Sequence, residues 1–192
     1  MIGALYSWTI RLAEHPKALW ALAIVAFVES SVFPIPPDVL MIPMILARPP
    51  RAFLIAFVAM VASVLGGMLG YAIGAFAFET IGQPILAMLG KADYMAEFNQ
   101  RFNDFGFWPV LIAGITPFPY KVITIMSGWT GLPVMTFVVT SIIARGFRFF
   151  VVAGLLWKFG PPIRDFIERR LGLMFTIAVA LLIGGFAAVK LL

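Results

Sequence analysis

Residues 52–78 form a run of 27 residues without a formal charge. Because an α-helix rises about 1.5 Å per residue, a helix over this run exceeds the roughly 30 Å hydrocarbon core of a bilayer. The runs 133–157 and 171–189 are also long enough to span it, although the first contains Arg145 and Arg148. The chain is 62% hydrophobic and 12% charged, whereas soluble domains carry roughly 25% charged residues. We therefore expect an all-α integral membrane protein in which these three runs are transmembrane helices.

Two further apolar regions, 18–47 and 105–131, are interrupted by prolines and charged residues. Proline costs about 3 kcal/mol in a helix interior because it lacks an N–H donor and clashes with the preceding turn. Non-helical backbone persists at membrane depth only where protein buries it or where it lines a water-filled cavity. We therefore expect each region to form a re-entrant hairpin that enters and leaves the membrane on one side. The interrupting prolines are Pro34, Pro36 and Pro37 in the first region and Pro109, Pro117 and Pro119 in the second.

The two broken regions match each other at an offset of 83 positions. A unit of one hairpin and one spanning helix crosses the membrane an odd number of times, so two consecutive copies point in opposite directions. Inverted repeats with interrupted segments at matching positions indicate a transporter and mark its substrate site. The pairs at this offset are Pro34 with Pro117, Pro36 with Pro119, Asp38 with Lys121, Val39 with Val122 and Pro50 with Pro133.

A single membrane domain, 1–192, is therefore expected. The segment between the repeats mixes charges with aromatic residues at helical spacing, which indicates an amphipathic helix lying in the interface. The expected parts are repeat 1 at about 18–78, this interfacial linker at 79–104, repeat 2 at about 105–157, a second linker at 158–170 and a C-terminal transmembrane helix at 171–190.

The basic residues of the loops are divided unevenly between the two expected faces. Cytoplasmic loops carry the excess of Lys and Arg, so an eight-to-three division favours a cytoplasmic N-terminus. The face of the N-terminus holds Arg11, Lys17, Arg48, Arg51, Lys158, Arg164, Arg169 and Arg170, and the other face holds Lys91, Arg101 and Lys190.

Five charged residues fall inside the apolar segments, where an unpaired charge costs roughly 2.5–3.5 kcal/mol near the bilayer centre. The least costly arrangement pairs acids with bases around a hydrated cavity between the repeats. A structural role stays open for each of them, such as a helix cap, a salt-bridge partner or a lysine that reaches to the interface. The five residues are Glu29, Asp38, Lys121, Arg145 and Arg148.

A stripe of small residues, Gly66, Gly70 and Gly74, recurs at four-residue spacing in the first long run. Such a stripe is typical of helices that pack closely in membranes, so we expect a hairpin to lie against it. The hydroxyl of the neighbouring Tyr71 either reaches the cavity or serves packing, and the sequence leaves both open.

The chain has no cysteine and one histidine, which excludes disulfides, thiolate metal sites and a histidine pair for a metal. We expect no metal, no cofactor and no catalytic residue. An intramembrane enzyme acting on lipid phosphates would lack the cysteine, deep histidine or clustered carboxylates that its chemistry needs. The net charge of +5 is explained by loop topology, so nucleic acid is not an expected partner.

Four motifs follow one another in the chain: ESSVFPIPPD from Glu29, the glycine stripe with Tyr71, TPFPYKVITIMSG at 116–128, and RGFRF from Arg145. In this order they resemble the DedA membrane proteins, the bacterial branch of the SNARE-associated or VTT-domain family. The resemblance covers about residues 25–160, and the segment from TPFPYK to SG is most similar to the YqaA-like subgroup.

The resemblance implies two re-entrant hairpins with inverted-repeat helices. It also implies lipid translocation across the bilayer, either phospholipid scrambling or recycling of a polyprenyl phosphate, with the proton-motive force as driver. The functional residues that it carries over are Glu29, Asp38, Arg145 and Arg148. The chain departs from the family pattern at Lys121, where many members have an arginine, and lysine cannot clamp a phosphate bidentately.

We expect a multi-pass protein of the bacterial inner membrane that moves phospholipid or polyprenyl (undecaprenyl) phosphate between leaflets. Lys121, Arg145 and Arg148 are expected to bind the phosphate, while Glu29 and Asp38 balance charge and relay protons. Membrane lipids and protons are the expected partners, and a homo-oligomer stays open. The alternatives are an ion- or proton-coupled transporter of a small solute, an intramembrane enzyme and a non-transporting membrane-homeostasis factor.

Overall fold

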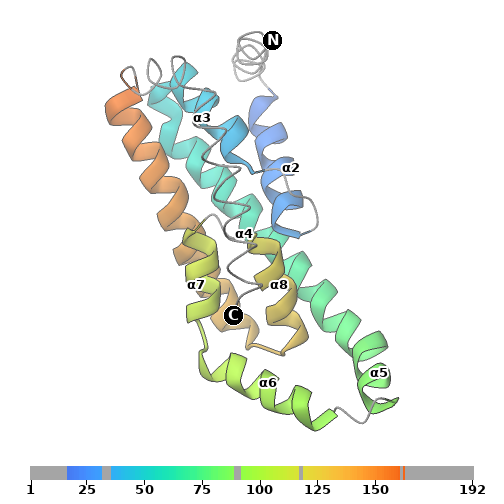
Figure 1. The fold of residues 1–192 in the computed structure, drawn as a ribbon. Helices are drawn as coiled ribbons and strands as arrows, with labels where there is room; N and C mark the ends of the chain where they lie inside the picture. Colours follow the sequence, from blue (N-terminus) through green and yellow to red (C-terminus); the bar gives the residue numbers. More distant parts are fainter. Residues whose placement is uncertain (1–16, 32–35, 89–91, 117–118, 161, 163–192) are drawn as a thin grey trace.

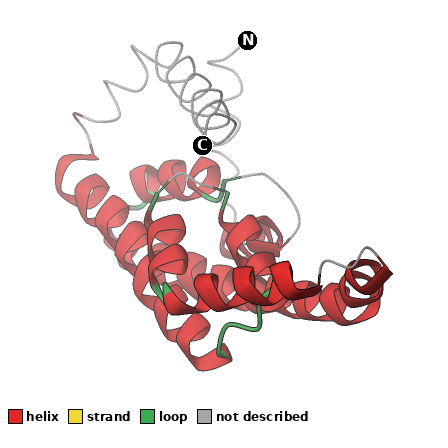
Figure 2. Ribbon diagram, turned by 60° about the horizontal axis from the view of Figure 1, so that its bottom comes forward, coloured by secondary structure: helices red, strands yellow, loops and turns green. Residues whose placement is uncertain are grey.

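The computed structural model describes residues 17–31, 36–88, 92–116, 119–160 and 162. Every regular element in these ranges is helical, and none is a strand (Figure 2). Two helices are long and apolar enough to cross a membrane, Pro49–Ile85 and Val134–Gly160. The expected all-helical class is confirmed for the described residues. The third expected span, 171–190, lies outside them.

The first broken region contains two helices, α2 (Ala18–Ser31) and α3 (Asp38–Ala47). α3 turns back toward the end of the molecule from which α2 starts (Figure 1). Pro37 is the N-cap of α3, with a φ of −63° that suits entry into a helix. Pro34 lies outside the described residues. The prolines therefore separate two half-length helices where an uninterrupted sequence would form one.

A 3-10 turn, η1 (Pro49–Arg51), leads into the long helix α4 (Ala52–Ala77). The helix continues through a π-helical turn, η2 (Phe78–Gly82), into α5 (Gln83–Met88). The sequence had placed the start of a separate linker at residue 79. The backbone stays helical across this position: the N–H of Gln83 bonds the carbonyl of Phe78 in the π-helical turn, and α5 then includes Pro84.

The second broken region begins after α6 (Ala92–Asp104), which crosses the lower end of the molecule in Figure 1. It contains α7 (Trp108–Ile115) and α8 (Tyr120–Trp129), which contact each other. Pro119 precedes α8 in an extended conformation, and Pro117 lies outside the described residues. α7 starts and α8 ends at the lower end of the molecule in Figure 1, near α6. α3 ends at the opposite, upper end.

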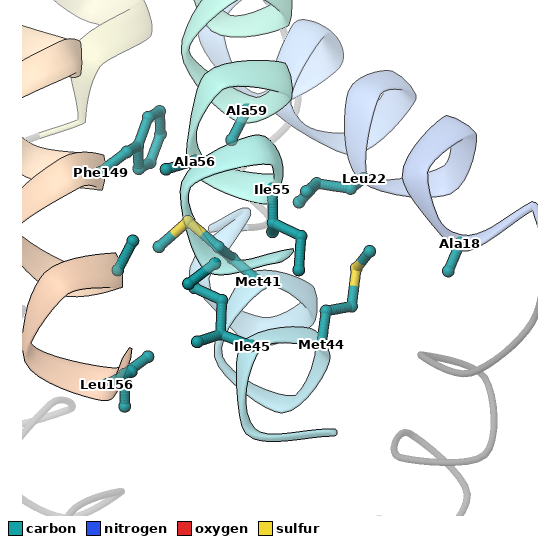
Figure 3. Close-up of a cluster of buried hydrophobic side chains, with 12 residues drawn as sticks. Ala18, Leu22, Met41, Met44, Ile45, Ile55, Ala56, Ala59, Phe149 and Leu156 are labelled. Atoms are coloured by element: carbon teal, nitrogen blue, oxygen red, sulfur yellow. The ribbon is translucent and has the colours of Figure 1, made fainter. Parts of the chain in front are cut away.

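The last described helix, Val134–Gly160, returns along α4 and continues three residues into the expected linker 158–170. It shares an apolar cluster with α2, α3 and α4, and a second cluster joins α7, α8 and the start of this helix. Figure 3 shows the first cluster, whose labelled residues are Ala18, Leu22, Met41, Met44, Ile45, Ile55, Ala56, Ala59, Phe149 and Leu156.

Helix α4 is the central element because both broken regions pack on it, through α2 and through α8. A Cβ atom at Gly66 would overlap the backbone carbonyl of Phe27 in α2, and one at Gly74 would overlap that of Ile125 in α8. Gly70, between them, lies against Thr124 of α8 and the carbonyl of Ser30 in α2. The glycine stripe thus allows the backbones of α2 and α8 to contact the backbone of α4 closely.

Candidate polar site between the helix breaks

Two ion pairs connect the first broken region to the helix Val134–Gly160. In the first pair, Nη2 of Arg145 lies 2.6 Å from Oε2 of Glu29. In the second, Nη2 of Arg148 lies 2.6 Å from Oδ2 of Asp38. All four partners come from the set of five charged residues that the sequence placed inside apolar segments. The fifth, Lys121, stands in the first turn of α8 and is partly buried.

Arg145 is enclosed on all sides by groups that match its chemistry. Its side chain is 1% exposed, and Nε donates to Oγ of Ser63 at 2.6 Å. Nη2 is also 3.4 Å from Oγ of Ser30, which shares a 2.7 Å hydrogen bond with Oγ of Ser63. The guanidinium carbon lies 4.6 Å from the ring centroid of Tyr120 and 4.9 Å from that of Phe149. Hydrogen bonds in the plane and rings over the faces offset the desolvation of this cation.

Arg148 joins the two helix breaks directly. While Nη2 binds Asp38 at the start of α3, Nη1 donates to the backbone carbonyl of Thr116 at 3.0 Å. Thr116 is the C-cap of α7, so its carbonyl is one of those that a helix end leaves without an internal partner. One guanidinium therefore supports the beginning of one half-helix and the end of another.

Asp38, whose position matches that of Lys121 in the sequence repeat, pairs with Arg148. The match shows that Asp38 and Lys121 occupy equivalent positions in the two repeats. It does not show which side chains contact each other. Arg145 and Arg148 stand three residues apart on one helix face, and they meet the two acids of the first broken region in chain order.

Several buried polar residues of this site were not singled out from the sequence. The hydroxyl of Tyr120 donates to Oγ of Ser141, and Oγ1 of Thr124 donates to the carbonyl of Ser30 at 3.1 Å. Hydroxyls inside an apolar run are a weak signal because serine and threonine occur widely in membrane helices. Grouping them by helical phase around the arginines would have found them. They are Ser30, Ser63, Tyr120, Thr124 and Ser141.

Tyr71 does not reach the ion pairs. Its hydroxyl donates to the carbonyl of Leu132 at 2.6 Å, near the turn that precedes the last described helix. Its ring packs against Phe137 with centroids 5.3 Å apart. Tyr71 therefore belongs to the packing of α4 against the second broken region.

Among the described residues, no three of His, Cys, Asp and Glu gather closely enough to hold a metal ion. The chemistry of the site is instead that of two carboxylates, two guanidinium groups and a set of hydroxyls. Such an arrangement can bind an anion, exchange partners between carboxylate and anion, and pass a proton through a carboxylate.

Comparison with known proteins places the chain in a family. The VTT domain matches residues 35–158, more than half of the chain. An uncharacterized protein of Haemophilus influenzae is 38% identical over 172 residues, which cover 88% of this chain and 89% of that protein. An uncharacterized protein of Histophilus somni is also 38% identical over 172 residues, covering 88% and 90%. No solved structure matches the chain significantly. The chain therefore belongs to the VTT-domain, or DedA, family of membrane-associated proteins.

Proposed function

We propose that this protein moves a phosphate-bearing lipid between the two leaflets of the bacterial inner membrane. The substrate is a phospholipid or a polyprenyl phosphate such as undecaprenyl phosphate, and the movement is coupled to the proton-motive force. The protein acts as a transporter and not as an enzyme. The observation that carries this proposal is the pair of ion pairs at interrupted helices, deep within apolar segments.

Charged residues at membrane depth are costly and are retained where they serve a pathway for an ion or a polar group. Arg145, Arg148 and Lys121 supply the positive charge that attracts a lipid phosphate. Glu29 and Asp38 balance that charge, and either carboxylate can accept a proton. The acyl or prenyl chains meanwhile remain in the surrounding lipid, because the apolar residues of the helices face outward.

The order of elements supports the proposed architecture. A pair of half-length helices followed by one long helix occurs twice, first as α2, α3 and α4, then as α7, α8 and Val134–Gly160. We propose that these are inverted repeats and that the N-terminus lies in the cytoplasm. In this arrangement the two re-entrant pairs enter from opposite faces and meet at the polar site.

A leaflet assay tests the function. The purified protein is reconstituted in liposomes that contain fluorescent phospholipid or polyprenyl phosphate, with and without a proton gradient. We expect labelled lipid to reach the opposite leaflet faster than in protein-free liposomes. Absence of movement for both lipids under both conditions would overturn the proposal.

Two variants that each replace a charged side chain by a neutral one, Asp38→Asn and Arg148→Gln, extend the assay. A lipid transporter that uses this site should slow severalfold with Arg148→Gln. If both variants keep full activity in cells, a non-transporting membrane-homeostasis factor explains the protein better. If solute uptake responds to the variants and lipid movement does not, the substrate is a small solute.

A further inference from the structure

The two ion pairs differ in how completely the protein encloses them. The side chains of Arg145 and Glu29 are 1% and 15% exposed, whereas those of Arg148 and Asp38 are both 20% exposed. The guanidinium of Arg145 also lies against two aromatic rings and two serine hydroxyls. An anion can therefore approach Arg148 without dismantling its surroundings, but it cannot approach Arg145 in this way.

The two ion pairs also differ in the helix ends at which their charges lie. Asp38 is the first residue of α3, where the helix dipole favours a negative charge. Arg148 holds the terminal carbonyl of α7, where the dipole favours a positive charge. Each member of this pair thus keeps a favourable neighbour when the pair opens.

Glu29 is in the opposite situation. It lies in the last turn of α2 (Ala18–Ser31), where the helix dipole disfavours a carboxylate. Its recorded partners are Arg145 and the hydroxyl of Ser30. Opening this pair would leave a carboxylate at an unfavourable helix end and a guanidinium buried without a counter-ion.

We propose that Arg148 is the exchangeable anion site of the protein, at which the phosphate of a lipid headgroup takes the place of Asp38. Asp38 is then the internal competitor of the substrate, and the pair of Arg145 with Glu29 is a permanent link. This division of roles rests on the proposed lipid transport. It adds a mechanical consequence, since exchange releases α3 from the arginine that also holds α7.

Binding to the full chain in detergent tests the exchange. Isothermal titration calorimetry is performed with two probes, inorganic phosphate and dioctanoyl phosphatidic acid. Because Asp38→Asn removes the competing charge, we expect this variant to bind the lipid probe about tenfold more tightly than the wild type. Arg148→Gln should lose binding. Glu97→Gln is the matched control, because it removes a carboxylate that pairs with Arg101 on exposed α6, and it should leave the affinity unchanged.

Glu29→Gln completes the set. It removes the same charge at the buried pair, and we expect a lower unfolding temperature without a gain in affinity. Asp38→Ser, which also removes the carboxylate and keeps a residue suited to a helix start, replaces Asp38→Asn if that variant does not fold. Equal or weaker binding of the lipid probe by the folded Asp38 variant would overturn the proposal.

The two probes and the leaflet assay separate the remaining outcomes. Binding of inorganic phosphate by the wild type as tightly as the lipid probe would show that the site takes free phosphate, which overturns the assignment of a lipid headgroup. If Asp38→Asn binds the lipid probe more tightly but no lipid moves in liposomes, the exchange site stands and the transport function falls. If lipid moves but Asp38→Asn shows no gain, transport stands and the exchange falls.

Discussion

The ion pairs Arg145–Glu29 and Arg148–Asp38 have the same chemistry and the same 2.6 Å separation, yet their surroundings differ. The first is enclosed by rings and hydroxyls and has a carboxylate at an unfavourable helix end. The second is partly open and has each charge at the helix end that suits it. The difference teaches that two arginines three residues apart can serve different roles, because burial and backbone ends set how easily each partner is released.

The largest expected effect comes from removing one acid from each pair and comparing the free energies of unfolding. Glu29→Gln should destabilise the protein by about 3 kcal/mol, since it leaves Arg145 buried without a counter-ion. Asp38→Asn should cost about 1 kcal/mol, because Arg148 is partly solvated and keeps the carbonyl of Thr116. Thermal unfolding in detergent measures both. Equal losses would contradict the distinction between the pairs.

The glycine stripe offers a second test, of how closely α2 packs on α4. Gly66→Ala places a Cβ atom into the carbonyl of Phe27, so α2 must move from α4. We expect a loss of about 1–3 kcal/mol, with the link between Ser30 and Ser63 weakened first. Gly154→Ala is the control, because a Cβ there meets no described atom within 4 Å. If both variants unfold alike, the close approach of α2 to α4 is not a source of stability.

Tyr120→Phe tests the enclosure of Arg145 more gently. It keeps the ring over the guanidinium and removes the buried hydroxyl that donates to Ser141. We expect a loss of about 1 kcal/mol in the free energy of unfolding. Tyr120→Leu removes the ring as well, and should cost more if the contact between ring and cation contributes. Equal values for the two variants would show that the hydroxyl alone matters.

The smallest effect is expected at the exposed pair of Arg101 with Glu97 on α6. Arg101→Gln should change the free energy of unfolding by less than about 0.5 kcal/mol, because both side chains are solvated. This variant provides the baseline against which the two interior pairs are compared. A loss as large as that of Asp38→Asn would place the Arg148 pair among ordinary surface pairs.

The sequence predicted which charged residues lie in this site better than it predicted which of them contact each other. Prolines and charges in apolar runs identified both broken regions and all four members of the ion pairs. They did not identify Arg148 as the partner of Asp38, because that contact depends on how α3 and the last described helix are rotated about their axes. The hydroxyls around Arg145 were missed because serine and threonine occur widely in membrane helices and are a weak signal.

The apolar run ends at Phe78, but the helix continues from α4 into α5. Glu79 was read as the start of an interfacial linker because a charge there ends the apolar run. A local π-helical turn instead carried the helix on past Gly82. A single charged residue marks where an apolar run ends. Where the helix ends depends instead on backbone hydrogen bonds.

The length of the helix Pro49–Ile85 makes the protein responsive to the membrane around it. Its 37 residues extend up to about 55 Å, and a tilt of 40° still leaves about 42 Å along the membrane normal. A bilayer with a 30 Å core therefore leaves part of the helix in the headgroup layer or beyond. Glu79, exposed on the π-helical turn, resists being drawn into the core. A thicker bilayer would thus favour a more upright orientation of this helix, and the half-length helices packed on it would move with it.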